Sequence, residues 1–204
     1  MLEVKDLCCA RGEQQLFSGL NFTVSGGEII QVQGKNGSGK TTLLRTLCGF
    51  SIPVKGEVIW NGSAIHEIDD EFHSDIVYLG HLNAIKEELS ALENLRISSA
   101  ISGWSISDND ALGALSRIGL QGRETFPVRV LSQGQRRRVA LARLLVSKAS
   151  LWILDEPLTA LDVGAVELVQ SMIKLHLSNN GMVVFTTHQT LDISGVEIRC
   201  LALS

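Results

Sequence analysis

Eight consecutive residues, 34–41, fit the phosphate-binding pattern G-x-x-x-x-G-K-[ST] in full, and Thr42 completes the loop. A strand-like segment, 28–33, precedes them, and a short helix-like segment, 43–48, follows and is closed by Gly49. This order predicts an anion site, because backbone N–H groups and the helix dipole at a helix N-terminus both favour phosphate oxygens. We therefore expect a nucleoside triphosphate to contact this loop. Its residues are Gly34, Lys35, Asn36, Gly37, Ser38, Gly39, Lys40, Thr41 and Thr42.

Two carboxylates follow a second apolar segment and suit hydrolysis of that triphosphate. Residues 151–154 are continuously apolar, as in a strand buried on both faces, and Asp155 and Glu156 come directly after them. Lys40 would reach the β- and γ-phosphates, while Thr41 and Asp155 would hold Mg²⁺, Asp155 through bound water. Glu156 would orient or deprotonate the attacking water. A strand followed by an ordinary polar turn is the alternative.

A third segment, Leu131–Gln135, combines serine and glycine at the start of a predicted helix. The hydroxyl and the free N–H groups there would form a second phosphate-binding end. A chain with two such ends is unusual unless two copies enclose the nucleotide between them. The segment therefore predicts a second copy of the chain as a partner.

The elements that would position these residues alternate between strands and helices. Strand signals at 2–7, 21–24, 28–33, 57–60 and 76–79 are followed by helical signals between about 83 and 147. Directly after 57–60, Asn61–Gly62 predicts a hairpin turn. Strand character returns at 151–154, 182–185 and 197–203, the last predicted to be an edge strand. We predict a single α/β domain, 1–204, with a mostly parallel central sheet. An N-terminal antiparallel β portion and a helical subdomain inserted at roughly 83–147 complete the predicted fold.

Composition and charge argue against several classes of partner. The 204 residues carry a net charge of −4 with a pI of about 5.7, which does not favour nucleic-acid binding. Arg136–Arg138 is the one basic run, and we interpret it as a solvated helix face. The sequence has no apolar run of the roughly 18 residues needed to span a membrane, and residues 1–7 look like a strand rather than a targeting peptide. The four cysteines lack zinc-site spacing, so we expect reduced, mostly buried thiols in a cytosol-like compartment.

Five motifs in the same order resemble the ATP-binding subunits of ABC transporters, over nearly the whole chain. Besides the phosphate loop and the strand before Glu156, they are Leu131–Gln135, Ala160–Asp162 and Thr186–His188. The resemblance implies the ABC ATPase fold, a P-loop NTPase core, and ATP hydrolysis in a head-to-tail dimer. Each ATP would lie between the phosphate loop of one copy and Ser132, Gly134 and Gln135 of the other. It also implies that His188 contacts the γ-phosphate and that Asp162 couples the two sites.

Two positions depart from the family's pattern. Arg11 stands near the position of an aromatic residue that stacks on adenine, which leaves base selectivity open, since Arg11 can stack on a base or lie in solvent. His81 stands where the family has a glutamine that reaches Mg²⁺ and links the site to the membrane partner. Because Mg²⁺ prefers oxygen ligands, we expect contact through a water. We hypothesise that His81 keeps the coupling role and makes it sensitive to pH between about 6 and 7.

One branch of the family, the ATP-binding subunits of cytochrome c maturation, often described as haem exporters, is resembled by the segments 78–81, 85–86, 89–95, 135–144, 151–157 and 186–189. This implies integral membrane permease subunits of that type as partners. It also implies that the chain itself is peripheral, at the cytoplasmic face of the bacterial inner membrane or an organellar equivalent. No C-x-x-C-H motif occurs and the histidines are scattered, so we expect no direct haem binding. Alternatives are the ATPase of a different small-molecule or lipid exporter, a soluble ABC protein acting on nucleic acid, and a small-molecule kinase.

Overall fold

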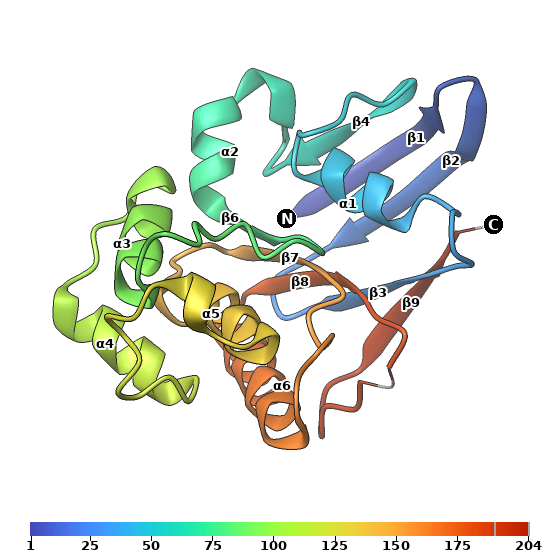
Figure 1. Cartoon of the computed structure of the whole chain (residues 1–204). Helices are drawn as coiled ribbons and strands as arrows, with labels where there is room; N and C mark the ends of the chain where they lie inside the picture. The colour runs from blue at the N-terminus through green and yellow to red at the C-terminus, as the bar shows by residue number, and fades with distance from the viewer. Residues whose placement is uncertain (190, 204) are drawn as a thin grey trace.

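The computed structural model describes residues 1–189 and 191–203, and it contains two β-sheets with helices on both sides of the larger one (Figure 1). The antiparallel sheet has the order β2-β1-β4-β5. Its strands are β1 (Leu2–Arg11), β2 (Gln14–Val24), β4 (Lys55–Trp60) and β5 (Ser63–Ala64). The parallel sheet has the order β6-β7-β8-β3-β9. Its strands are β6 (Ile76–Leu79), β7 (Leu151–Asp155), β8 (Met182–Thr186), β3 (Ile29–Gln33) and β9 (Ile198–Ala202).

The central strands β7 and β8 of the parallel sheet are buried on both faces, which explains their continuous apolar sequences. Along β7, Leu151 and Ile153 pack toward β1, β2 and α1 (Lys40–Leu47), whereas Trp152 and Leu154 pack toward the opposite layer of helices. Alternate residues of a strand point to opposite faces, so each face needs its own apolar set. The sheet therefore separates two hydrophobic cores and brings the carboxyl ends of four adjacent strands to one edge.

Helices between β6 and β7 form an insert beside the parallel sheet. They are α3 (Ala91–Ile101), α4 (Asp108–Arg117) and α5 (Gln133–Val146), with a 3₁₀ turn at Val128–Val130. Ser90, Ser107 and Ser132 begin these helices, each in a reciprocal capping box with the residue three positions later. The fold class predicted from the sequence is confirmed, including the helical insert. The bounds 83–147 of the insert and the single domain 1–204 remain predictions.

Several local predictions are confirmed. Asn61 and Gly62 have φ values of 50° and 93° in the hairpin between β4 and β5, as a type I′ turn requires. Gly49, with φ of 77°, ends α1 just beyond Cys48, and β9 lies at the edge of the parallel sheet.

Other elements differ from the sequence predictions. The strands β1 and β2 are longer than predicted, since irregular pairing between Val4 and Ala10 hides their alternation. The short helix α2 (Asp69–Asp75) was not predicted, and α6 (Val163–Ser178) follows β7. All four cysteines are free, but only Cys9 and Cys48 are buried. Within the described residues, no helix combines the length and the apolar character that a membrane span requires.

Candidate functional site

A cavity of about 670 Å³ lies at the edge of the parallel sheet where β3, β6, β7 and β8 end. Ten of the residues predicted from the sequence line it: Asn36, Gly37, Gly39, Lys40, Thr41, Thr42, His81, Asp155, Glu156 and His188. The remaining loop residues, Gly34, Lys35 and Ser38, support the loop without lining the cavity. Four loops from separate parts of the chain thus meet at one site, because parallel strands place their carboxyl ends together.

The start of α1 forms the anion-binding wall of this cavity. Gly39 precedes the helix with φ of 96°, and a Cβ there would come within 3.0 Å of the side chain of Leu16. Among the described residues, α1 has no side-chain cap and no acidic residue in its first turn. Its first N–H groups, at Lys40, Thr41 and Thr42, are therefore open to a phosphate. The ammonium of Lys40 donates to the carbonyl oxygens of Gly34 at 2.7 Å and Lys35 at 3.2 Å.

Asp155 lies opposite this wall and is almost fully buried, with 3% of its surface exposed. The Thr41 hydroxyl donates to its Oδ2 at 2.9 Å, and the Thr186 hydroxyl donates to its Oδ1 at 2.7 Å. These bonds compensate for part of the cost of burying the carboxylate. They also attach the phosphate loop and β8 to the end of β7.

Glu156 is in the left-handed region, with φ of 51°, which is uncommon for a residue other than glycine. Its backbone N–H bonds to the carbonyl oxygen and hydroxyl of Thr186, at 3.2 and 3.1 Å. Its carboxylate accepts the backbone N–H of His188 at 3.2 Å, and its Oε1 lies 3.5 Å from His188 Nε2. The structure therefore brings Glu156 and His188 together at the mouth of the cavity.

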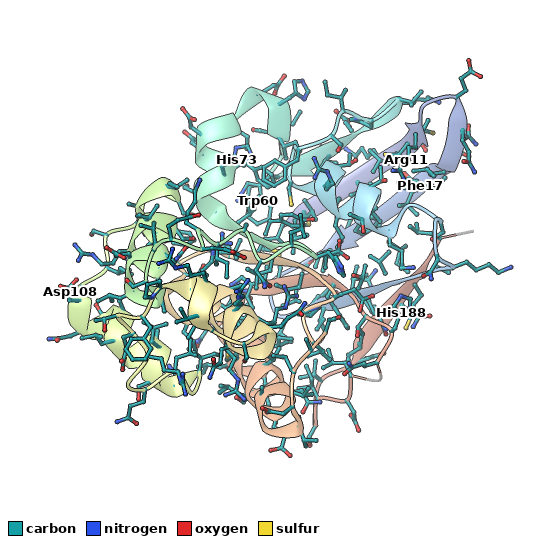
Figure 2. The ribbon with its side chains drawn as sticks, in the orientation of Figure 1. Arg11, Phe17, Trp60, His73, Asp108 and His188 are labelled. Carbon is teal, nitrogen blue, oxygen red and sulfur yellow. The ribbon has the colours of Figure 1, made fainter. Side chains whose placement is uncertain are left out.

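Arg11 and His81 also line the cavity, each from a different part of the fold. Figure 2 shows Arg11 on the antiparallel sheet and His188 below it on the same side of the view, in the loop after β8. His81 lies in the loop after β6 and is exposed. Gln14 and Leu16 complete the wall near Arg11. Near the same edge, burial and the charge of Asp155 raise the pKa of Tyr78 to about 12, so its phenol stays protonated.

Ser132, Gly134, Gln135 and Asp162 are not among the residues that line the cavity. Ser132 caps α5, and its hydroxyl accepts from Gln135 N–H at 3.3 Å. Gly134 lies against the loop before α6, since a Cβ there would come within 3.2 Å of the Ala160 carbonyl oxygen. Asp162 caps α6, and its contacts with Ala165 N–H and the Arg138 guanidinium hold its pKa below the usual value. One copy of the chain does not bring these residues to its own phosphate loop.

Comparison with known proteins agrees with this geometry. A family model described as "ABC transporter" matches residues 17–159. The chain is 56% identical over its full length to the cytochrome c biogenesis ATP-binding export protein CcmA of Nitrosomonas europaea, covering 96% of that protein. It is 46% identical to the protein of the same description from Escherichia coli K12, with 100% of this chain and 97% of that protein covered.

The chain belongs to the ABC transporter family.

Solved structures of ABC transporter proteins share its fold. An ATP-binding protein from Pyrococcus furiosus, described as a putative ABC transporter, superposes with a TM-score of 0.85 at 28% identity, covering 99% of this chain and 96% of that one. A bacterial ABC transporter cassette solved as a dimer gives 0.86 at 25% identity, covering 99% and 94%. As an ABC transporter ATPase domain, the chain binds ATP, and cassettes of this family dimerise and pair with membrane subunits.

The basic run of this ABC protein is not a solvated face, which corrects the sequence interpretation. Arg136 pairs with Glu87 at 2.6 Å, and Arg138 pairs with Asp162. Arg137 points inward and is only 4% exposed. Consecutive helix residues point about 100° apart, so three in a row cannot share one face. The spacing of Arg137 from Leu141 and Leu144, both buried, could have indicated its direction.

Proposed function

We propose that two copies of this chain hydrolyse ATP as a head-to-tail dimer. Each ATP would lie between residues Gly34–Thr42 of one copy and Ser132, Gly134 and Gln135 of the other. The observation that carries the proposal is the division of the site. The phosphate loop and the carboxylates of Asp155 and Glu156 line one cavity, while the capped start of α5 lies outside it. A second copy supplies what the first lacks.

The residues of the cavity fit Mg²⁺ as well as ATP. Thr41 and Asp155 offer hydroxyl and carboxylate oxygens, the ligands that this ion prefers. Among the described residues no cluster of three or more His, Cys, Asp or Glu side chains could hold a metal, so the phosphates of ATP would supply further ligands. When bound, the ion neutralises charge on the phosphate oxygens. Lys40 and the N–H groups of α1 would bind the same oxygens.

Glu156 would orient or deprotonate the water that attacks the γ-phosphate, and His188 would contact that phosphate. The 3.5 Å approach of His188 Nε2 to Glu156 Oε1 lets both side chains face one reacting group. Asp162 would couple the two sites across the dimer, since it lies in the loop that contacts Gly134 through Ala160. His81, in the same cavity as Asp155, would report nucleotide state to the membrane partner.

The ATPase works in the export complex of cytochrome c biogenesis, which its similarity to the CcmA proteins supports. Its partners would be integral membrane permease subunits, and the chain itself would be peripheral, at the cytoplasmic face of the bacterial inner membrane. A groove of about 680 Å³ between the loop after β6 and the start of α5 suits this contact. It is lined by Leu82, Asn83, Ala84, Ile85, Glu87, Leu131, Gln133 and Arg136. The absence of direct nucleic-acid and haem binding remains a prediction.

Complementation between two inactive variants tests the head-to-tail site. Lys40→Ala damages the phosphate loop, and Gly134→Asp places a carboxylate where the second copy would meet phosphate. Each variant alone should be inactive, but a mixed dimer contains one intact site. An equimolar mixture that exchanges subunits freely should recover about a quarter of the wild-type ATPase rate, because half of the dimers are mixed and each has one working site of two. A mixture no more active than its components would contradict the proposed arrangement.

A further inference from the structure

Arg137 lies on α5 and donates hydrogen bonds to oxygen atoms of two loops. It therefore connects three parts of the site: the helix and the two loops. Its side chain, from the second turn of α5, is 4% exposed. Toward the loop after β7, it donates to the carbonyl oxygens of Asp155 at 3.4 Å, Glu156 at 2.8 Å and Pro157 at 3.4 Å. Toward the loop after β6, it donates to the Gly80 carbonyl oxygen at 3.2 Å and Asn83 Oδ1 at 3.0 Å.

The chemistry of the side chain suits this bridging position. A guanidinium presents five N–H donors in a rigid plane, so one group can bond to two loops at fixed angles. Burial lowers the pKa of Arg137, while the negative charges of Asp155 and Glu156 raise it. The cation is therefore stabilised by the two carboxylates, although its hydrogen bonds go to carbonyl and amide oxygens. A glutamine could reach only one of the two loops.

The contact with Glu156 matters because that residue is in a strained conformation. With φ of 51° it keeps this geometry only while neighbouring groups hold it. Thr186 holds the backbone N–H, and Arg137 holds the carbonyl oxygen through the shortest of its bonds, 2.8 Å. The peptide groups on both sides of the strained residue are thus fixed, and so is the direction of the carboxylate.

The contacts with the other loop surround His81. Gly80 and Asn83, the two acceptors, lie just before and two residues after it. The same guanidinium therefore fixes the backbone around His81 and the backbone of Glu156. It does so from α5, the helix that begins at Ser132.

We propose that Arg137 is a positioning residue for ATP hydrolysis, which holds Glu156 in its strained conformation and ties it to the His81 loop and to α5. This inference rests on the role of Glu156 proposed above. Movement of α5 against the partner copy would then be transmitted to Glu156 through Arg137. Arg137 is not itself among the residues that line the cavity, so its loss should impair the chemical step rather than ATP binding.

The test compares kcat and KM of the full-length protein at a concentration that saturates dimer formation. Arg137→Gln should lower kcat by about 10–100-fold and change KM for ATP by less than about threefold, because a small displacement of a catalytic group slows reaction without removing binding contacts. Arg137→Lys should retain more activity than Arg137→Gln, since its ammonium can still donate to the Glu156 carbonyl. For both variants, thermal unfolding is measured as a check on folding, and binding of a non-hydrolysable ATP analogue as a check on nucleotide binding.

Arg143→Gln is the matched control, because Arg143 lies on the same helix and its burial likewise lowers its pKa. In the part of the chain that the structure describes, Arg143 makes no hydrogen bond or ion pair with either loop. This variant should keep kcat within about twofold of wild type. Equal loss in Arg143→Gln and Arg137→Gln would overturn the inference, and so would a wild-type kcat in Arg137→Gln. A rise in KM with kcat unchanged would overturn it as well.

Glu156→Gln separates this inference from the proposed function. If Glu156→Gln loses activity while Arg137→Gln keeps it, the positioning role is wrong and the hydrolytic role stands. If Glu156→Gln turns over at the wild-type rate, the proposed mechanism itself is wrong. Should Arg137→Gln fail to fold, Arg137→Lys decides the question. A folded lysine variant with wild-type kcat would show that hydrolysis does not need a guanidinium bonded to both loops.

Discussion

Asp155 accepts from threonine hydroxyls on two different elements, Thr41 on α1 and Thr186 at the end of β8. Both bonds end on a carboxylate that is 3% exposed, so water contributes little to its solvation. Thr186 is itself fully buried and also accepts from the Glu156 N–H. One hydroxyl therefore supports the carboxylate of Asp155 and the backbone of Glu156.

Thr186→Val tests this support, because valine keeps the shape of threonine and removes the hydroxyl. The free energy of unfolding should fall by about 1–3 kcal/mol, the cost of leaving a buried polar group without its partner. Urea unfolding measures the change, and ATPase kcat should fall with it. Thr187→Val is the control, since the Thr187 hydroxyl accepts from Gln189 N–H and contacts neither carboxylate. An equal loss in both variants would contradict the specific role of Thr186.

At the level of elements, the sequence predicted those whose signals are local. The order of strand, loop and helix around residues 34–42, the strand β7 and the Asn61–Gly62 turn each follow from a few adjacent residues, and the structure confirms them. The helix α2 was missed because it is short and polar, and Phe72 is the buried residue that anchors it. Its formation depends on tertiary packing more than on its own pattern.

The candidate site could be predicted where each motif carries its own chemistry, and not where partners are distant in sequence. The cavity gathers ten predicted residues, because strand ends in a parallel sheet meet at one edge. Thr186 and Arg137 were not given roles, since their acceptors lie on other loops, up to 57 residues away. Such contacts follow from the packing of α5 and β8 against β7 rather than from any local pattern.

The packing of α6 on β7 makes the free energy of unfolding depend on pH. His176 of α6 stacks on Trp152 of β7 with ring centroids 3.9 Å apart and an interplanar angle of 6°. Burial lowers the pKa of His176 from its ordinary 6.5, and the carbonyl groups of Met182 and Ser150 offset only part of this. Protons therefore bind the unfolded chain more tightly than the folded one. The stabilisation by the neutral ring is complete above pH 6.5 and declines as pH falls below that value.

His176→Phe should flatten this part of the stability profile while keeping a ring against Trp152. The free energy of unfolding, measured by urea titration between pH 7.5 and 5, should decline less in the variant than in wild type. His66→Phe is the control, because His66 is exposed, and it should show the wild-type slope. If the His176→Phe profile declines as steeply as that of wild type, the neutral buried histidine is not the cause.

At the scale of the whole molecule, one chain presents two incomplete surfaces. The nucleotide cavity lacks the groups at the start of α5, and the groove beside α5 exposes Leu82, of which 82% is accessible. Arg136 and Glu87 pair at 2.6 Å within that groove, so its two sides are held together. The helix α5 borders the groove, begins at Ser132 and carries Arg137, which bonds to Glu156. A partner in the groove and a second copy at Ser132 would therefore both act on α5.

Leu82→Gln tests whether the groove receives the membrane subunits. An exposed leucine at the centre of a contact buries apolar area on binding, so its loss should weaken association by about tenfold or more. Co-purification of membrane subunits with the tagged full-length protein measures the effect, with thermal unfolding as the check on folding. Leu175→Gln is the matched control, because Leu175 is 55% exposed on α6 and does not line the groove. Undiminished co-purification with Leu82→Gln, or an equal decrease with Leu175→Gln, would place the membrane contact on another surface.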